Sequence, residues 1–469
     1  MKLKKSLLLV ILVASSVSLS AQVTSKSSEQ LIAESQTGAM PLFFEIPKNQ
    51  LLGSDVMSFR NKKEFTLRGG LPNFFRKTKA KKPVIIGYFG GSITRADNQY
   101  RLQSAAYIQR LFPDVVMKGI NAGVSGTGTD LGACRLYNQI LQYKPDLVFV
   151  EFAVNGGPDE AMEGIIRQLK KYNPKTDICL IYTITQTKPY TIGEIPDNIA
   201  RLEKIAAHYN LPSIHLGLQA AMLEKEEKLL WKGSVTEQSG KIIFSSDGVH
   251  PSAAGGNLYA SAIARAMVQL KGMNGKRLKK MPTPLLADNW EDANMVDPLE
   301  TAQFSKGWTS IKPTEFADFK QFESWFPYIM KAENAGESFS FKFEGKALGI
   351  FDIGGPEAGQ LELTVDGKNV QLKKTQAKRV QFAELIESEQ PALLNRFNTY
   401  CKNRYRGQFD IVELEPGIHT VELTVSAQKA DKASILGVSN LSGNSNFSEK
   451  YQQNCIYIGK ILLRGKVIK

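Results

Sequence analysis

Four short segments of this chain together contain the groups that acyl transfer through a serine requires. They are, in order, Gly90-Gly91-Ser92-Ile93-Thr94, Asn121-Ala122-Gly123-Val124-Ser125-Gly126, Phe152-Ala153-Val154-Asn155 and Asp247-Gly248-Val249-His250-Pro251. A serine hydroxyl attacks a carbonyl when a histidine accepts its proton and a carboxylate orients that histidine. Amide groups can then stabilise the oxyanion that forms. The four segments therefore predict a site for serine-dependent acyl transfer.

The candidate nucleophile is Ser92, and the candidate base is His250. Ser92 follows an apolar run (84–89) and two glycines, which places it at the end of a predicted strand. By itself, Gly-Gly-Ser also fits a phosphate-binding turn or a simple tight turn. Asp247 and His250 are three residues apart, so in a turn the carboxylate can reach one imidazole nitrogen and leave the other free. That spacing alone also fits an Asp helix cap beside a surface histidine.

The remaining histidines lack a carboxylate at this spacing. The chain contains four histidines, and we interpret His208, His215 and His419 as structural. Asn155 ends an apolar run (147–154), where its amide could reach the site. Gly126 lies in a glycine-rich loop whose N–H could approach an oxyanion closely because no Cβ intervenes.

The elements that must position these groups alternate between strand and helix. Apolar runs typical of buried strands and stretches with helical spacing follow one another from Val84 to Leu270. Such repetition predicts an α/β fold with a parallel sheet covered on both faces, and chemistry beyond the carboxyl ends of its strands.

Beyond Lys271 the apolar period becomes two, which predicts strands. Phe339, Phe341 and Phe343 alternate with polar residues. Asp366-Gly367 predicts a hairpin, and the alternation returns at Val421, Leu423 and Val425, after Pro416-Gly417. We predict an all-β sandwich for the second part of the chain.

The four segments resemble the sequence blocks of the SGNH (GDSL-type) hydrolase superfamily, over about residues 71–272. The resemblance implies a flavodoxin-like α/β/α sandwich, with Ser92 as nucleophile, His250 as general base and Asp247 orienting it. It also implies an oxyanion hole made of the N–H groups of Ser92 and Gly126 and the side chain of Asn155.

This chain departs from the family pattern at two positions beside the predicted site. The usual Gly-Asp-Ser is Gly90-Gly91-Ser92, which removes a carboxylate next to the nucleophile. The usual Gly-x-Asn-Asp is Ala153-Val154-Asn155-Gly156. The stretch 68–75 looks like exported bacterial members, many of which deacylate polysaccharides and carry an appended β-sandwich.

The chain has 469 residues, which favours two domains. Lys2, Lys4 and Lys5, a short apolar run and small residues before Gln22 predict a signal peptide. We divide the chain into a signal peptide (1–21), a lead-in (22–67), an SGNH-type hydrolase domain (68–272), a linker (273–287) and a β-sandwich domain (288–469). The expected location is periplasmic or secreted.

Charge and cysteine content narrow the possible partners. The net charge is +13, but the lysines are widely spread, so we expect a solvated surface and no nucleic-acid partner. The four cysteines form no metal pattern. Cys401 and Cys455 could pair in an oxidising compartment, and the sequence leaves this open. We expect no metal or organic cofactor and no membrane association after signal cleavage. The expected partner is an acylated carbohydrate. The sequence does not indicate the oligomeric state.

These observations predict a serine esterase that removes acetyl or other small acyl groups from a carbohydrate. The alternatives are a lipid or thioester hydrolase with the same residues, or a glycan-binding protein with a vestigial site. Trp290, Trp308, Trp325 and Tyr328 could stack on sugar rings or could pack in the core.

Overall fold

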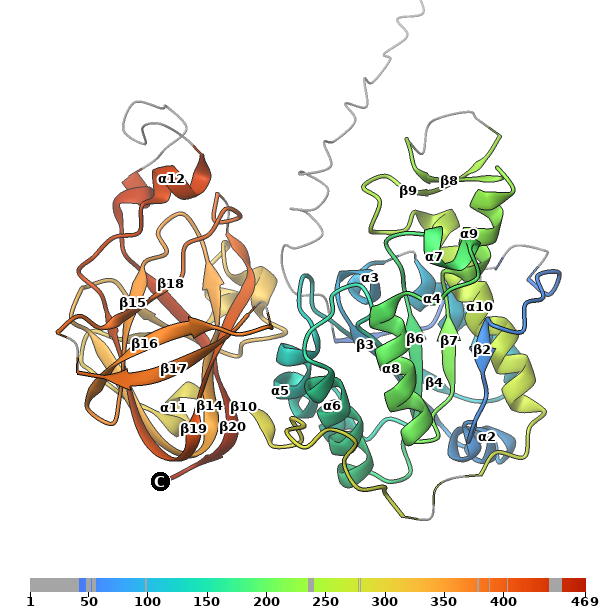
Figure 1. Ribbon diagram of the computed structural model, residues 1–469, viewed down its shortest axis with the longest axis horizontal. Coiled ribbons are helices and arrows are strands. Elements are labelled where there is room, and N and C mark those ends of the chain that lie inside the picture. The colour runs from blue at the N-terminus through green and yellow to red at the C-terminus, as the bar shows by residue number, and fades with distance from the viewer. Residues whose placement is uncertain are drawn as a thin grey trace, which may run out of the picture.

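The computed structural model of the chain contains an α/β half and a β-rich half that lie side by side (Figure 1). It describes residues 42–47, 52, 56–97, 99–234, 240–276, 278, 280–377, 379–387, 389–402, 404–437 and 449–469. The predicted signal peptide lies outside these residues. Among them, no helix combines the length and the apolar composition that crossing a bilayer requires.

The α/β half is built on a mixed sheet whose five central strands are parallel. In spatial order these strands are β4 (Met117–Gly123), β3 (Val84–Gly90), β5 (Leu147–Glu151), β6 (Asp177–Tyr182) and β7 (Ser213–His215). In chain order this is 2-1-3-4-5, the flavodoxin-like arrangement, with its switch point between β3 and β5. The prediction of this fold class is confirmed.

Two short antiparallel strands extend the sheet at its edges. β1 (Phe43–Phe44) pairs with β4, and β2 (Phe65–Thr66) pairs with β7. Both strands come from the predicted lead-in, so this segment takes part in the sheet. Separately, β8 (Leu229–Lys232) and β9 (Ile242–Ser245) form a small parallel pair that leads into the Asp247–His250 segment.

Helices cover both faces of this sheet because successive strand residues point to opposite faces. Val148 and Val150 pack with α5 (Thr129–Gln139), α6 (Asp159–Tyr172) and α8 (Asp197–His208). Leu147 and Phe149 pack with the helices of the other face. These are α2 (Pro72–Lys79), α4 (Tyr100–Leu111), α9 (Leu218–Lys225) and α10 (Ala253–Lys271). The shorter helices are α3 (Ser92–Arg95), α7 (Lys188–Thr191) and a 3-10 turn at Leu141–Tyr143.

The β-rich half is one sheet of eleven strands within the described residues. Its longest strands are β14 (Ser338–Gly354), β19 (Tyr405–Val425) and β20 (Ile456–Val467). The others are β10 (Ala293–Val296), β11 (Gln303–Phe304), β12 (Thr309–Ile311), β13 (Ile329–Ala332), β15 (Gln360–Val365), β16 (Lys368–Lys374), β17 (Val380–Ile386) and β18 (Ala392–Asn395). The helical segments are α11 (Pro298–Thr301), α12 (Lys432–Leu436) and 3-10 turns at Pro313–Glu315, Lys320–Phe322 and Glu449–Gln452.

This sheet folds back on itself because different parts of the long strand β19 pair with different strands. The first part of β19 pairs with β17 and its last part with β15, which encloses an apolar interior that includes Phe339, Phe341 and Phe343. The predicted hairpin at Asp366-Gly367 joins β15 to β16. β19 continues through Pro416-Gly417. Gly417 pairs with Gly345 at a register shift, where the long strands bulge.

The two halves share buried surface. Trp290, in the segment after the predicted linker, packs against α6, where a Cβ on Gly164 would lie 2.4 Å from the carbonyl carbon of Trp290. The apolar cluster on the α5–α6 face continues into Met295, Phe351 and Leu462 of the β-rich half. The halves are therefore packed as one body.

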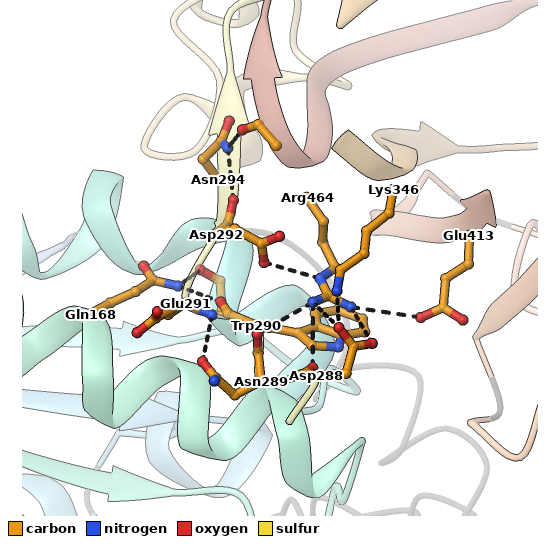
Figure 2. A network of polar contacts seen from close by, with 12 residues as sticks. Gln168, Asp288, Asn289, Trp290, Glu291, Asp292, Asn294, Lys346, Glu413 and Arg464 are labelled. Atoms are coloured by element: carbon orange, nitrogen blue, oxygen red, sulfur yellow. Dashed lines mark hydrogen bonds and ion pairs between the residues drawn. The ribbon is translucent and has the colours of Figure 1, made fainter. Parts of the chain in front are cut away.

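A polar network surrounds this apolar contact (Figure 2). The guanidinium of Arg464 on β20, which is 1% exposed, donates to Asp292 at 3.1 Å and to Asp288 at 3.0 and 3.1 Å. It also lies over the ring of Trp290, 4.9 Å from the ring centroid. Gln168 on α6 donates to the carbonyl of Trp290 at 3.0 Å. These contacts fix the β-rich half against α6.

Candidate active site

The turn after β3 presents Ser92 at the carboxyl end of the central sheet. Gly90 ends the strand, Gly91 follows, and Ser92 begins α3 with a side chain that is largely buried. Neither glycine leaves room for a side chain. A Cβ on Gly90 would lie 2.4 Å from the carbonyl oxygen of Glu151, and one on Gly91 would lie 1.8 Å from Oδ1 of Asn155. Close packing of neighbouring loops therefore requires Gly-Gly here.

Asp247 organises the second segment of the site, which follows β9. Its Oδ1 accepts the N–H groups of Val249 and His250, both at 2.8 Å, and lies 2.9 Å from the hydroxyl of Ser245. Gly248 has a φ of +86°, a left-handed conformation that favours glycine in this turn. The backbone thus wraps around one carboxylate oxygen and leaves the other for the imidazole.

His250 connects the carboxylate to the serine. Its Nδ1 lies 2.6 Å from Oδ2 of Asp247, and its Nε2 lies 2.7 Å from Oγ of Ser92. An ionised carboxylate can only accept hydrogen bonds, so Nδ1 carries the proton and Nε2 is free to accept the hydroxyl proton of Ser92. This is the orientation that a general base needs.

The surroundings of Asp247 favour its ionised form. Burial alone raises the pKa of this carboxyl, but hydrogen bonds from the His250 side chain and from the backbone N–H groups of His250 and Val249 outweigh that effect. The pKa of Asp247 therefore lies well below its usual range. A stable negative charge beside the imidazole favours the imidazolium that forms when Ser92 is deprotonated.

Gly126 and Asn155 follow the two strands that flank β3. Gly126 has a φ of +64°, which favours glycine, and Asn155 places its side chain against Gly91. Oδ1 of Asn155 is buried and has no hydrogen-bond partner among the described residues. The two loops are joined where the N–H of Thr129 donates to the carbonyl of Gly156 at 2.9 Å. Their roles as oxyanion donors stay predictions.

A cleft of about 910 Å³ lies beside Gly126 and Asn155 and is bounded by both halves of the protein. The β-rich half contributes Arg379, from the connection between β16 and β17, and the exposed Tyr400. The lining groups are mainly polar: Asp130, Asp159, Glu160, Arg201, Gln376 and Arg379 among others. A polar cleft of this size can accommodate a hydrophilic molecule larger than the acyl group.

Asp130 is a buried carboxyl on the α/β side of this cleft. Burial raises its pKa, and the N–H of Leu131 and the charge of Arg379 lower it, with a net rise. The guanidinium of Arg379 in the β-rich half thus acts electrostatically on Asp130, at the start of α5.

The other three histidines have structural contacts. His208 Nε2 lies 2.8 Å from the carbonyl of Thr283, and His215 Nδ1 lies 2.6 Å from the hydroxyl of Tyr190. Burial lowers the pKa of His215 to about 4. His419 does have a carboxylate partner, Asp366, at 2.8 Å, which the sequence spacing did not indicate. Its Nε2 contacts a backbone carbonyl at 2.8 Å, so His419 has no nitrogen free for a substrate.

The four cysteines are free, so the structure contains no Cys401–Cys455 disulfide. Trp290, Trp308 and Trp325 are buried, which agrees with packing rather than sugar stacking. Sequence reasoning missed Glu151, Asp130, Arg379 and Tyr400. Only Glu151 had a visible signal, a charged residue at the end of an apolar strand.

Comparison with known proteins identifies the α/β half. Residues 88–258 match the family model of the GDSL-like lipase/acylhydrolase family. Among solved structures, a two-domain esterase (CEX) active on acetylated mannans is similar with a TM-score of 0.60 and 20% identity, over 88% of this chain and 99% of that chain. A second structure of the same esterase matches with a TM-score of 0.58 and 19% identity, over 87% and 98%.

The acetylxylan esterase Axe2 from Geobacillus stearothermophilus is 20% identical, with a TM-score of 0.30, over 42% of this chain and 97% of that chain. A search of curated proteins finds no significant match. The matches to CEX cover both halves, so this chain shares the two-domain fold. Residues 88–258 match the model of the GDSL-like lipase/acylhydrolase family, and they lie in the α/β half of that fold.

Proposed function

We propose that this protein is an exported serine esterase that removes acetyl or other small acyl groups from a carbohydrate. The observation that carries this proposal is the continuous Ser92–His250–Asp247 arrangement, with hydrogen-bond distances of 2.7 and 2.6 Å. A serine oxygen within reach of an unprotonated imidazole nitrogen, next to an ionised carboxylate, is suited to nucleophilic attack on an ester.

The reaction proceeds in two steps. Ser92 Oγ attacks the ester carbonyl while His250 Nε2 takes its proton, and amide donors on Gly126 and Asn155 stabilise the oxyanion. The ester C–O bond breaks, and the imidazolium protonates the departing sugar oxygen. Water then attacks the acyl-enzyme, with His250 again accepting and returning a proton, and releases the carboxylic acid and Ser92.

The polar cleft supports a carbohydrate as the alcohol part of the substrate. Its carboxylates, guanidinium groups and amide can form hydrogen bonds with sugar hydroxyls, whereas a long acyl chain requires an apolar channel. The similar fold of CEX, an esterase active on acetylated mannans, gives the same substrate class further support.

Hydrolysis of matched substrates tests this proposal. The purified protein should release acetate from acetylated mannan or acetylated xylan, and its rate on aryl esters should fall as the acyl chain lengthens from acetate to octanoate. Ser92→Ala should lose several orders of magnitude in kcat while its circular dichroism spectrum stays unchanged.

Two results would count against the proposal. A preference for octanoate over acetate would favour the lipid or thioester hydrolase. Binding of the polysaccharide without any hydrolysis would favour a glycan-binding protein. Export is tested separately, by N-terminal sequencing of the mature protein, which we expect to begin near Gln22.

A further inference from the structure

Glu151 is a buried carboxylate that the reaction above does not use. It ends β5, whose preceding residues Leu147, Val148, Phe149 and Val150 are apolar, and its side chain is 0% exposed. Burying a charged group is costly unless hydrogen bonds compensate. It lies at the switch point of the sheet, on β5 next to Gly90 of β3 and four residues before Asn155, so its burial there requires an explanation.

The contacts of Glu151 surround the nucleophile turn. Its Oε2 accepts the hydroxyl of Thr94 at 2.9 Å, and its Oε1 accepts the hydroxyl of Thr183 at 2.5 Å. The backbone N–H of Gly91 also donates to this carboxylate. Gly91 and Thr94 lie on either side of Ser92 in the chain, so one carboxylate holds the turn at two points.

Glu151 also interacts electrostatically with the imidazole of His250. Burial raises the pKa of Glu151, while the hydroxyls of Thr183 and Thr94, the Gly91 N–H and the charge of His250 lower it, with a net rise. Two phenols lie close as well: Tyr100 on α4, whose hydroxyl is 2.7 Å from Thr94 Oγ1, and Tyr259 on α10.

Burial, and in addition the charge of Glu151, raises the pKa of both phenols, so both are neutral at neutral pH. Among these neighbours, His250 is the group whose charge lowers the pKa of Glu151.

We propose that Glu151 is a positioning residue of the esterase site, which holds the Ser92 turn through Thr94 and the backbone of Gly91. The side chain of Asn155 occupies the space that a Cβ on Gly91 would fill. Glu151 reaches the N–H of Gly91 from the adjacent strand.

The test compares Glu151→Gln with Asp177→Asn, a matched control. Asp177 is also a buried carboxylate in the same sheet, but it begins β6 and accepts the N–H groups of Asn73 and Phe74 at 2.8 Å. Removal of its charge should lower the thermal stability and leave catalysis per folded molecule unchanged. Both variants are assayed for kcat and KM with an aryl acetate.

We expect Glu151→Gln to lower kcat about 10–100-fold with little change in KM, the range seen when an outer hydrogen-bond partner of a functional group is lost. Asp177→Asn should leave kcat unchanged. A kcat in Glu151→Gln equal to that of the wild type would overturn the proposal.

If Glu151→Gln does not fold, Thr94 provides the second test. Thr94→Val removes one link between the carboxylate and the turn and should lower kcat, whereas Thr94→Ser should restore kcat. Equal kcat in all three forms would overturn the proposal. The proposal rests on the esterase function proposed above. Ester hydrolysis by the wild type and its loss in Ser92→Ala are therefore measured first. If either result is not obtained, the proposed function is wrong, and the variants of Glu151 do not bear on it.

Discussion

Substitution of Gly91 should damage catalysis through Asn155, not through the backbone. Gly91 has a φ of −91°, which is outside the left-handed region that favours glycine. A Cβ there would lie 1.8 Å from Oδ1, 2.6 Å from Cγ and 3.3 Å from Nδ2 of Asn155. These distances are far below van der Waals contact, so Gly91→Ala must displace the amide from the nucleophile turn.

The expected cost follows from the role proposed for that amide. Loss of one oxyanion donor lowers kcat by about 10²–10³, or ~2.7–4 kcal/mol of transition-state stabilisation. Gly91→Ala and Asn155→Ala should each cause a loss of this size with little change in KM. If the two effects were independent, the double variant would lose about 10⁴–10⁶ in kcat.

The structure predicts strong coupling instead. In Asn155→Ala, all three atoms that obstruct a Cβ on Gly91 are absent, so adding Gly91→Ala should have little further effect. The assay is kcat on an aryl acetate for the two single variants and the double variant. Gly272→Ala is the control, because a Cβ at Gly272 has its nearest neighbour at an ordinary 3.7 Å. Additive losses, or normal kcat in Gly91→Ala, would refute the reasoning.

Three further predictions concern the charge network, the interface and the cleft. Asp247→Asn should lower kcat by about 10⁴, because the amide cannot hold the required tautomer of His250. The pKa of Asp247 lies below its ordinary value of 3.8, so its stabilising effect is present at neutral pH and is lost as the pH falls below that value; the Tm difference between wild type and Asp247→Asn should therefore shrink from pH 7 to pH 3. Arg464→Met should destabilise the protein by roughly 2 kcal/mol in urea unfolding, less than for a fully buried pair because Asp288 and Asp292 are half-exposed. Lys466→Met, an exposed position on the same strand, should stay within about 0.5 kcal/mol of wild type, and equal effects would contradict the interface role. Tyr400→Ala should raise KM for an acetylated oligosaccharide and leave aryl acetate hydrolysis unchanged, with Tyr172→Ala on α6 as the control; a loss on both substrates would mean that Tyr400 is structural.

Local sequence signals were sufficient to place the residues of the proposed triad. Asp247 and His250 are three residues apart, so one turn determines their relative position, and the glycines before Ser92 follow an apolar strand. The parallel sheet was predictable for the same reason, because each of its central strands is a short buried run between helices. The prediction of the triad depended on the order of the four segments along the chain. The resemblance to the SGNH hydrolases depended on the same order.

Features that depend on distant contacts were not predictable. β1 and β2 are each two residues long and form because they pair with β4 and β7. Segments this short show no alternation of apolar and polar residues from which a strand could be predicted. The apolar run that ends at Val154 leaves the sheet at Glu151, because the next residues turn to bring Asn155 to Gly91. Pro416-Gly417 has a turn composition but forms a bulge, since long strands on both sides hold it in register. Arg379 and Tyr400 reach the cleft only through the arrangement of the two halves.

The shared buried surface makes the two halves depend on each other during unfolding. Arg464 contacts Asp288 across 176 positions of sequence, and the apolar face of α5 and α6 is covered by residues from β10, β14 and β20. Separation of the halves would expose this face to water, so partial unfolding is unfavourable and a single calorimetric transition is expected. The same long-range contacts form late in folding, and until then the α5–α6 face is open to association with other chains.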